Sequence, residues 1–168
     1  MSRAFVKESD DDQTAGELPE RPVAGHANYV TPQGLEQLQA RVRQLQERHE
    51  QLAPRVAEDS IAKQKQREIE RDMRYFIAQL DRAIVVDPAG QPRDEVHFGA
   101  TVKIIDEEGT EHRFSLVGED EADVNAGKIS WASPLAKAMM GARVGDSVMW
   151  RRPAGDIEVE IAEITYPQ

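Results

Sequence analysis

YVTPQGLEQLQARVRQLQERHEQLAPRV, residues 29–56, is the stretch that decides the fold. It opens with signals for a helix start, because Thr31 is a suitable N-cap and Pro32 suits the first helical position. The positions that follow alternate steps of three and four residues for three heptads, as a coiled-coil seam requires. These positions are Leu35, Leu38, Val42, Leu45, His49, Leu52 and Val56. Pro54 predicts the end of the helix.

A second helical pattern with the same alternation follows. Its stripe consists of Ala62, Gln66, Ile69, Met73, Phe76, Leu80 and Ala83. Only a few residues around Pro54 to Ser60 separate the two patterns, so we expect an antiparallel hairpin and not a long parallel dimer. At 1.5 Å per residue, each arm should project roughly 30–35 Å.

Two composition changes divide the chain into three parts. Residues 1–28 contain the run Asp10-Asp11-Asp12, several prolines and glycines, and few apolar residues, so we expect a mostly disordered acidic tail. Its one candidate anchor is Ala4-Phe5-Val6. After Asp87-Pro88-Ala89-Gly90 the apolar period changes from 3.5 to 2, which predicts a hairpin over 29–87 and a second domain over 88–168.

The second domain is predicted to contain mainly strands. The predicted strands are 96–105, 112–117, 128–132, one at Val148 and Trp150, and 157–166. Ser133-Pro134 should cap a short helix from Leu135 to Met140. In the last strand the alternation slips by one residue near Ala162, which predicts a β-bulge. The expected class is α+β: a helical hairpin followed by an antiparallel sheet with one helix.

Composition excludes several classes of function. Lys and Arg number 21 against 31 Asp and Glu, a net charge of −10 that argues against duplex binding by phosphate neutralisation alone and against anionic membranes. The chain has no cysteine, so disulfides, thiol nucleophiles and zinc–thiolate sites are excluded. Its four histidines are scattered and no Gly-rich phosphate loop occurs, so we expect no autonomous enzyme and no metal site. Because no apolar run is long enough for a signal peptide or a membrane span, we expect a cytoplasmic protein with no membrane partner.

Two charged clusters remain as candidate sites. At the tip of the hairpin, Glu58 and Asp59 could supply oxygen ligands to a magnesium ion held mainly by another protein. The alternative, which we favour, is that Asp59 or Ser60 caps the second helix. The second cluster is a basic face, with a solvated, ion-paired helix surface as its alternative. That face consists of Lys63, Lys65, Arg67, Arg71 and Arg74, beside Glu68, Glu70 and Asp72. Acidic residues 119–123 are predicted to form a solvated loop.

Several motifs resemble those of the bacterial GreA/GreB transcript-cleavage factors. In the hairpin they are Tyr29-Val30-Thr31-Pro32-Gln33-Gly34-Leu35, Arg67-Glu68-Ile69-Glu70-Arg71, Arg74-Tyr75 and Ile84-Val85-Val86-Asp87. In the second domain they are Phe98-Gly99-Ala100, His112-Arg113-Phe114, Val117-Gly118, Ile129-Ser130, Ser133-Pro134-Leu135-Ala136-Lys137-Ala138, Val144-Gly145-Asp146 and Pro153-Ala154-Gly155. The resemblance covers about residues 29 to 168.

This resemblance implies a coiled-coil hairpin followed by a domain of FKBP-like fold. It also implies that the domain docks at the secondary channel of RNA polymerase and that the hairpin enters the channel. In the family, a tip Asp and Glu help to hold a Mg²⁺ in the polymerase, which is the enzyme; the factor is an accessory without a cofactor of its own. Lys63, Lys65 and Arg67 match basic family positions, which implies contact with nascent RNA or with the channel.

The sequence departs from the family pattern in two places. Only twelve residues separate Pro54 from Arg67, so each arm should be shorter by roughly two turns, on the order of 10 Å, and the acidic tip run is missing. Ala132 stands where the family typically has Asp in its docking motif. We expect polymerase docking through Trp131, Ser133, Pro134 and Leu135, with the alternative that Trp131 and Leu135 are core residues.

The sequence therefore predicts a monomeric elongation factor that binds RNA polymerase and stimulates cleavage weakly or not at all. One alternative is a non-cleaving regulator that competes with true cleavage factors for the channel. Two others come from different classes: an FKBP-like prolyl isomerase or chaperone, and a purely structural coiled-coil adaptor. Fold alone does not establish the isomerase activity.

Overall fold

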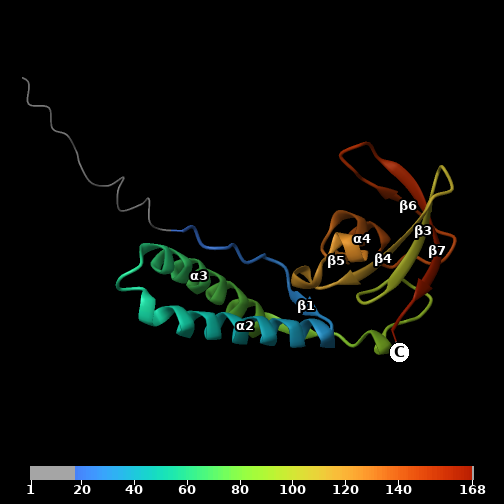
Figure 1. Cartoon of the computed structure of the whole chain (residues 1–168). Coiled ribbons are helices and arrows are strands. Elements are labelled where there is room, and N and C mark those ends of the chain that lie inside the picture. Colours follow the sequence, from blue (N-terminus) through green and yellow to red (C-terminus); the bar gives the residue numbers. More distant parts are fainter. Residues whose placement is uncertain (1–17, 168) are drawn as a thin grey trace, which may run out of the picture.

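The computed structural model describes residues 18–167 and shows a helical hairpin beside a β-rich domain (Figure 1). The hairpin consists of α2 (Pro32–Leu52) and α3 (Ser60–Arg82), joined through the short 3-10 helix η1 (Ala53–Arg55). With 21 and 23 residues, the helices are about 32 and 35 Å long, which confirms the predicted antiparallel hairpin and its reach. Within the described residues, no helix is both long and apolar enough to cross a membrane.

Local signals set the start of both helices. The side chain of Thr31 accepts a hydrogen bond from the backbone N–H of Gly34 at 2.9 Å, and Pro32 occupies the first turn. Oδ1 of Asp59 accepts from the backbone N–H groups of Ile61 at 2.9 Å and Ala62 at 3.3 Å. Both caps satisfy N–H groups that have no partner inside the helix.

The seam between the helices changes from apolar to polar toward the tip. Leu38, Val42 and Leu45 of α2 are buried in the packing of α2 against α3. Further along the same stripe, Nε2 of His49 lies 3.0 Å from Oε1 of Glu70 and 3.1 Å from Nε2 of Gln66. A polar layer therefore replaces apolar contact at this level of the predicted seam.

The two ends of the hairpin are tied together by a small parallel sheet. Its strands are β1 (Asn28–Val30) and β2 (Ala83–Val85), paired residue for residue. The 3-10 helix η2 (Pro88–Gly90) then leads into the second domain. Segments of three residues show too little alternation to be predicted as strands, and their pairing joins positions more than fifty residues apart.

Residues 18–28, which we call the strap, run alongside α3 (Figure 1). The guanidinium of Arg21 lies 3.9 Å from the ring centroid of Tyr75. Nearer the base of the hairpin, Nη2 of Arg82 donates to the carbonyl of Ala24 at 3.0 Å. The strap is therefore an ordered part of the hairpin surface.

This placement corrects the prediction that residues 1–28 are a disordered tail, which is wrong for the strap. Apolar periodicity does not reveal an extended segment that is held by cation–π contacts and ion pairs. Residues 1–17, with the candidate anchor Ala4-Phe5-Val6, lie outside the described residues.

The second domain is built on a five-stranded sheet with the spatial order β5-β4-β3-β7-β6. Its strands are β3 (Thr101–Asp106), β4 (Glu111–Val117), β5 (Lys128–Ser130), β6 (Ser147–Trp150) and β7 (Ile157–Thr165). Between β3 and β7, Lys103 pairs with Glu163 whereas Ile104 pairs with Ile161. Ala162 is thus the additional residue, and the predicted bulge is confirmed.

The α+β class is confirmed, with one strand differing in direction. Three of the four strand pairs are antiparallel, but β5 runs parallel to β4. The chain between Val117 and Lys128 contains the 3-10 helices η3 (Glu119–Glu121) and η4 (Val124–Ala126). This connection runs back along β4, so that β5 begins beside β4 and points in the same direction as β4. A simple antiparallel meander is therefore not the topology of this sheet.

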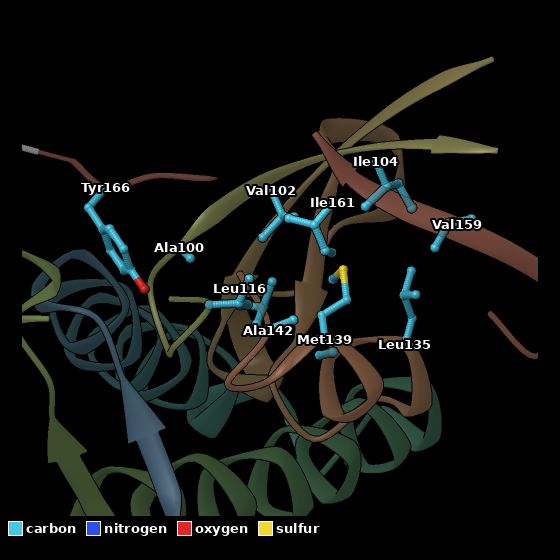
Figure 2. Close-up of a cluster of buried hydrophobic side chains, with 12 residues drawn as sticks. Ala100, Val102, Ile104, Leu116, Leu135, Met139, Ala142, Val159, Ile161 and Tyr166 are labelled. Atoms are coloured by element: carbon cyan, nitrogen blue, oxygen red, sulfur yellow. The ribbon is translucent and has the colours of Figure 1, made fainter. Parts of the chain in front are cut away.

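The core of the domain lies between α4 (Pro134–Met139) and the sheet (Figure 2). Leu135 and Met139 point from α4 toward side chains of β3 and β7 (Figure 2). The buried cluster consists of Val96, Ala100, Val102, Ile104, Leu116, Leu135, Ala136, Met139, Ala142, Val159, Ile161 and Tyr166.

Candidate functional site

The hairpin tip carries the two acidic residues considered as metal ligands. Asp59 uses Oδ1 to cap α3, as the favoured interpretation predicted, and Glu58 is exposed in the preceding turn. Next to the cap, Ile61 is 73% exposed. Across residues 18–167, no group of three or more His, Cys, Asp or Glu side chains could hold a metal ion. The structure thus shows Asp59 in its capping role and Glu58 exposed beside it.

The predicted basic face divides into two surfaces. Lys63, Arg67, Arg71 and Arg74 are spaced by four, four and three residues, so they share one stripe of α3, which we call the basic stripe. Lys63 and Arg67 are exposed, whereas Arg71 is half-buried, with Nη2 3.4 Å from Oδ1 of Asp72.

Lys65 belongs to a different surface, a groove of about 460 Å³ between α2 and α3. Its cations are Arg41, Arg48, Arg55 and Lys65, and its carboxylates are Glu68 and Asp72. Apolar side chains of Leu45, Leu52 and Ile69 also line it. Four cations against two carboxylates favour an anionic occupant such as a phosphate backbone.

The acidic run after β4 holds the hairpin on the domain. The hydroxyl and the backbone N–H of Thr31 both donate to the carboxylate of Glu121, the latter at 3.2 Å to Oε2. Oε2 of Glu121 also accepts from the backbone N–H of Gly118 at 3.0 Å. The prediction of a solvated loop is wrong for Glu119–Glu121, because these carboxylates satisfy donors on the hairpin.

Asp120 and Glu119 make the corresponding contacts to α3 and the strap. The hydroxyl of Tyr75 donates to Oδ1 of Asp120 at 2.7 Å, and Nε2 of Gln79 donates to Oδ2 of Asp120 at 2.8 Å. Glu119 lies 3.3 Å from Nε2 of His26. Burial, together with the hydrogen bond to Asp120, raises the pKa of Tyr75, so the phenol remains a donor. We call Glu119–Glu121 the latch.

Aromatic rings form a second contact between the hairpin and the domain. Trp131 packs edge-on against Tyr29, with ring centroids 5.0 Å apart, and against His26 at 5.2 Å. Tyr29 also lies 6.2 Å from the ring of Phe98. The rings of Tyr29, Phe98 and Trp131 line a cavity of about 220 Å³ together with Met140 and other neighbours.

The structure distributes the four predicted docking residues over different environments. Trp131 is half-buried in the aromatic contact, and Leu135 is 7% exposed within the core. The side chain of Ser133 caps α4 by accepting from the backbone N–H of Ala136 at 3.3 Å. Of the four residues, Pro134 alone is exposed. Because Leu135 is buried, the alternative that it is a core residue is correct.

Comparison with known proteins places these features in a family. The family model "Transcription elongation factor, GreA/GreB, C-term" matches residues 91–166. Transcription elongation factor GreB from Neisseria meningitidis serogroup B is 38% identical over 153 residues, covering 83% of this chain and 94% of that protein. GreA from Trichlorobacter lovleyi is 46% identical over 111 residues, covering 66% of this chain and 70% of that protein.

Among solved structures, a GreA/GreB elongation factor from Nitrosomonas europaea is 28% identical, with 83% of this chain and 99% of that chain covered and a TM-score of 0.41. The sequence relationship to the two named factors spans both the hairpin and the β-rich domain. This chain belongs to the GreA/GreB family of transcription elongation factors.

Proposed function

We propose that this chain binds RNA polymerase and modulates transcription elongation, with weak or no stimulation of transcript cleavage. In this proposal it is an accessory factor: the polymerase holds the Mg²⁺ and performs the chemistry. Its GreA and GreB relatives carry the name of transcription elongation factors, which supports the partner. A polymerase partner implies a cytoplasmic location, and we expect the chain to act as a monomer.

The observation that carries the cleavage part of the proposal is the use of Asp59 as a helix cap. A carboxylate must reach magnesium at about 2.1 Å, and small displacements remove most of the catalytic benefit of a ligand. Asp59 is fixed to the first turn of α3, and Glu58 is its immediate neighbour and not a partner one helical turn away. The apolar Ile61 is also exposed at the tip, next to the cap.

The surfaces available for polymerase and RNA are the exposed start of α4 and the cationic parts of the hairpin. Pro134 is exposed on the domain, whereas Trp131 is half-buried and Leu135 is buried. The groove that contains Lys65 and Arg55 suits a phosphate backbone, which supports a contact with nascent RNA inside the complex.

Binding can be measured with a fluorophore on a single introduced cysteine, because the chain has none of its own. Glu108→Cys places the label in an exposed turn between β3 and β4. We expect the labelled chain to bind core RNA polymerase and to be displaced by a cleavage-competent GreA. A Pro134→Asp variant that stays folded should bind more weakly, whereas Glu58→Ala should bind like the parent. Absence of binding, or binding that GreA does not displace, contradicts the proposal.

The isomerase alternative has less support from the geometry. The cavity of about 220 Å³ is lined by aromatic rings, but Tyr29, Phe98 and Trp131 lie against one another at the junction. Tyr29 also belongs to the hairpin and not to the domain that resembles an isomerase. Catalysed isomerisation of a proline-containing peptide would be the result that supports the isomerase alternative.

A further inference from the structure

Three aromatic side chains line the cavity at the junction of the hairpin and the domain, and we call them the aromatic cage. They are Tyr29, Phe98 and Trp131. The planes of Tyr29 and Trp131 meet at 65°, and those of Tyr29 and Phe98 at 53°. Rings inclined in this way can surround one occupant from several sides with their electron-rich faces.

The size and lining of the cavity limit what it can hold. Its volume is about 220 Å³, and an apolar cavity of about 150 Å³ is sufficient to bind benzene. A compact group of similar size, such as a trimethylammonium headgroup, therefore has room. The lining contains no lysine, arginine, aspartate or glutamate, and its polar members are Gln91 and His97. The cavity wall thus offers aromatic faces but no ion-pair partner.

Other aromatic clusters of this chain have a cation of their own. The guanidinium of Arg21 lies 3.9 Å from the ring centroid of Tyr75. The guanidinium of Arg152 lies 5.3 Å from the ring centroid of Trp150, which packs against Phe114. Within the described residues, no lysine or arginine lies over a ring of the aromatic cage. The cage therefore differs from these clusters in having no internal cation on its rings.

The charges around the aromatic cage are mainly negative. Oε2 of Glu119 lies 3.3 Å from Nε2 of His26, whose ring packs on the cage. Oε2 of Glu95 lies 2.9 Å from Nε2 of His97 on the cavity wall, and Oε1 of Glu95 pairs with Arg143 at 2.7 Å. The whole chain carries a net charge of −10. These charges favour a positive occupant over a negative one.

We propose that the aromatic cage binds a quaternary ammonium group, such as the headgroup of choline, through cation–π contacts. The ring faces attract the positive charge, and its methyl groups fill the apolar space. A lysine-type ammonium is strongly hydrated and fits this lining less well. Because Tyr29 belongs to the hairpin whereas Phe98 and Trp131 belong to the domain, the bound group stabilises the observed arrangement of the two parts. The inference does not depend on binding to polymerase.

Titration with choline and with its uncharged isostere, 3,3-dimethyl-1-butanol, tests the role of the charge. The chain contains two tryptophans, so Trp150→Phe assigns the indole N–H signal of Trp131 in NMR spectra. Ionic strength is held constant with NaCl, at about pH 8, where histidine is neutral. We expect choline to shift the Trp131 signal saturably and to bind at least about fivefold more tightly than the isostere. Equal affinities, or no saturable shift, overturn the proposal.

Contacts between choline and the rings locate the site in the unmodified chain. Nuclear Overhauser effects should join the choline methyl protons to ring protons of Tyr29, Phe98 and Trp131. Trp131→Leu should weaken choline binding at least about fivefold, measured on the methyl signal of Met140, which also lines the cavity. Trp150→Phe, in the other cluster, should bind choline like the parent. Contacts only to Trp150, or equal losses in the two variants, overturn the proposal.

A free solute and a trimethylated lysine of a partner protein carry the same headgroup, and further titrations distinguish these sources. Tighter binding of a short peptide that contains trimethyllysine supports the partner side chain, whereas tighter binding of choline supports the free solute. Ethanolamine and the same peptide with unmodified lysine should each bind much more weakly than their methylated counterparts. Equal binding of methylated and unmethylated compounds overturns the proposal.

Discussion

The hydroxyl of Thr31 has two partners: it accepts from the backbone N–H of Gly34 and donates to the carboxylate of Glu121. One side chain therefore starts α2 and fixes that helix to the domain ninety residues further along the chain. The backbone of Gly34 lies close to the side chain of Glu121, because a Cβ added to Gly34 would lie 2.2 Å from Cδ of Glu121. Gly118 is similarly tight, with 2.6 Å between an added Cβ and the carbonyl oxygen of Tyr29.

Replacing Glu121 with Gln should lower the free energy of unfolding by about 1–3 kcal/mol, because a charged acceptor with three hydrogen bonds is lost from a half-buried position. Urea denaturation of full-length protein measures the change. Glu108→Gln, in an exposed turn, is the matched control and should be neutral. An equal effect of the two substitutions would contradict the assignment of Glu121 as a structural contact.

Gly34→Ala should destabilise the protein although Ala is the better helix former by up to about 1 kcal/mol. The added methyl group collides with the carboxylate of Glu121, so the latch has to move. In a double-mutant cycle with Glu121→Ala, the two effects should be clearly less than additive. Additive effects would show that Gly34 is required for another reason.

Arg21→Ala should lower stability by about 1 kcal/mol, because it removes a cation–π contact with Tyr75 and an ion pair with Asp72. Arg21→Lys keeps the charge but loses the planar stacking and should recover only part of the loss. Thermal unfolding of both variants tests whether the strap contributes to folding. A melting temperature unchanged in Arg21→Ala would show that the strap does not stabilise the hairpin.

Stability should decline in alkali through the raised pKa of Tyr75. In the unfolded chain a tyrosine ionises near pH 10, whereas in the folded protein Tyr75 retains its proton at that pH. The folded state therefore binds more protons, and the free energy of unfolding falls as the pH rises above about 10. The contribution is fully present below pH 10. Tyr75→Phe should make unfolding free energies measured between pH 8 and 11 less dependent on pH, with the remaining dependence including Tyr166, whose pKa burial also raises.

Local features of this fold were predictable from the sequence, and the contacts that join its parts were not. The caps at Thr31 and Asp59 and the bulge at Ala162 depend on neighbouring residues, so each left a signal in the sequence. The pairing of β1 with β2 and the contacts of the latch join positions far apart in the chain. The spacing of apolar residues along the sequence does not predict which distant hydrogen-bond donors a run of carboxylates will contact.

The candidate sites show the same limit. The sequence suggested both interpretations of Asp59, and the structure supplies two backbone donors for the capping role. Trp131 was predicted as a docking residue because an apolar residue beside a helix start suits a partner. Its true neighbours, Tyr29 and His26, come from the other end of the chain.

The tip of the hairpin allows capping and metal binding to be separated by substitution. Asp59→Ser keeps a good cap acceptor but removes the carboxylate, whereas Asp59→Ala loses both and should destabilise the hairpin by about 1 kcal/mol. We therefore expect Asp59→Ser to match the parent in stability and in binding to polymerase. A stability loss as large as that of Asp59→Ala would contradict the cap assignment.

Transcript cleavage in backtracked complexes, measured at saturating factor, tests the central claim most directly. The account predicts that the parent chain binds the complexes but leaves the cleavage rate within about twofold of the rate without factor, as do Glu58→Ala and Asp59→Ser. Strong stimulation by the parent that either substitution abolishes would contradict the account and identify these carboxylates as ligands that complete the polymerase active centre.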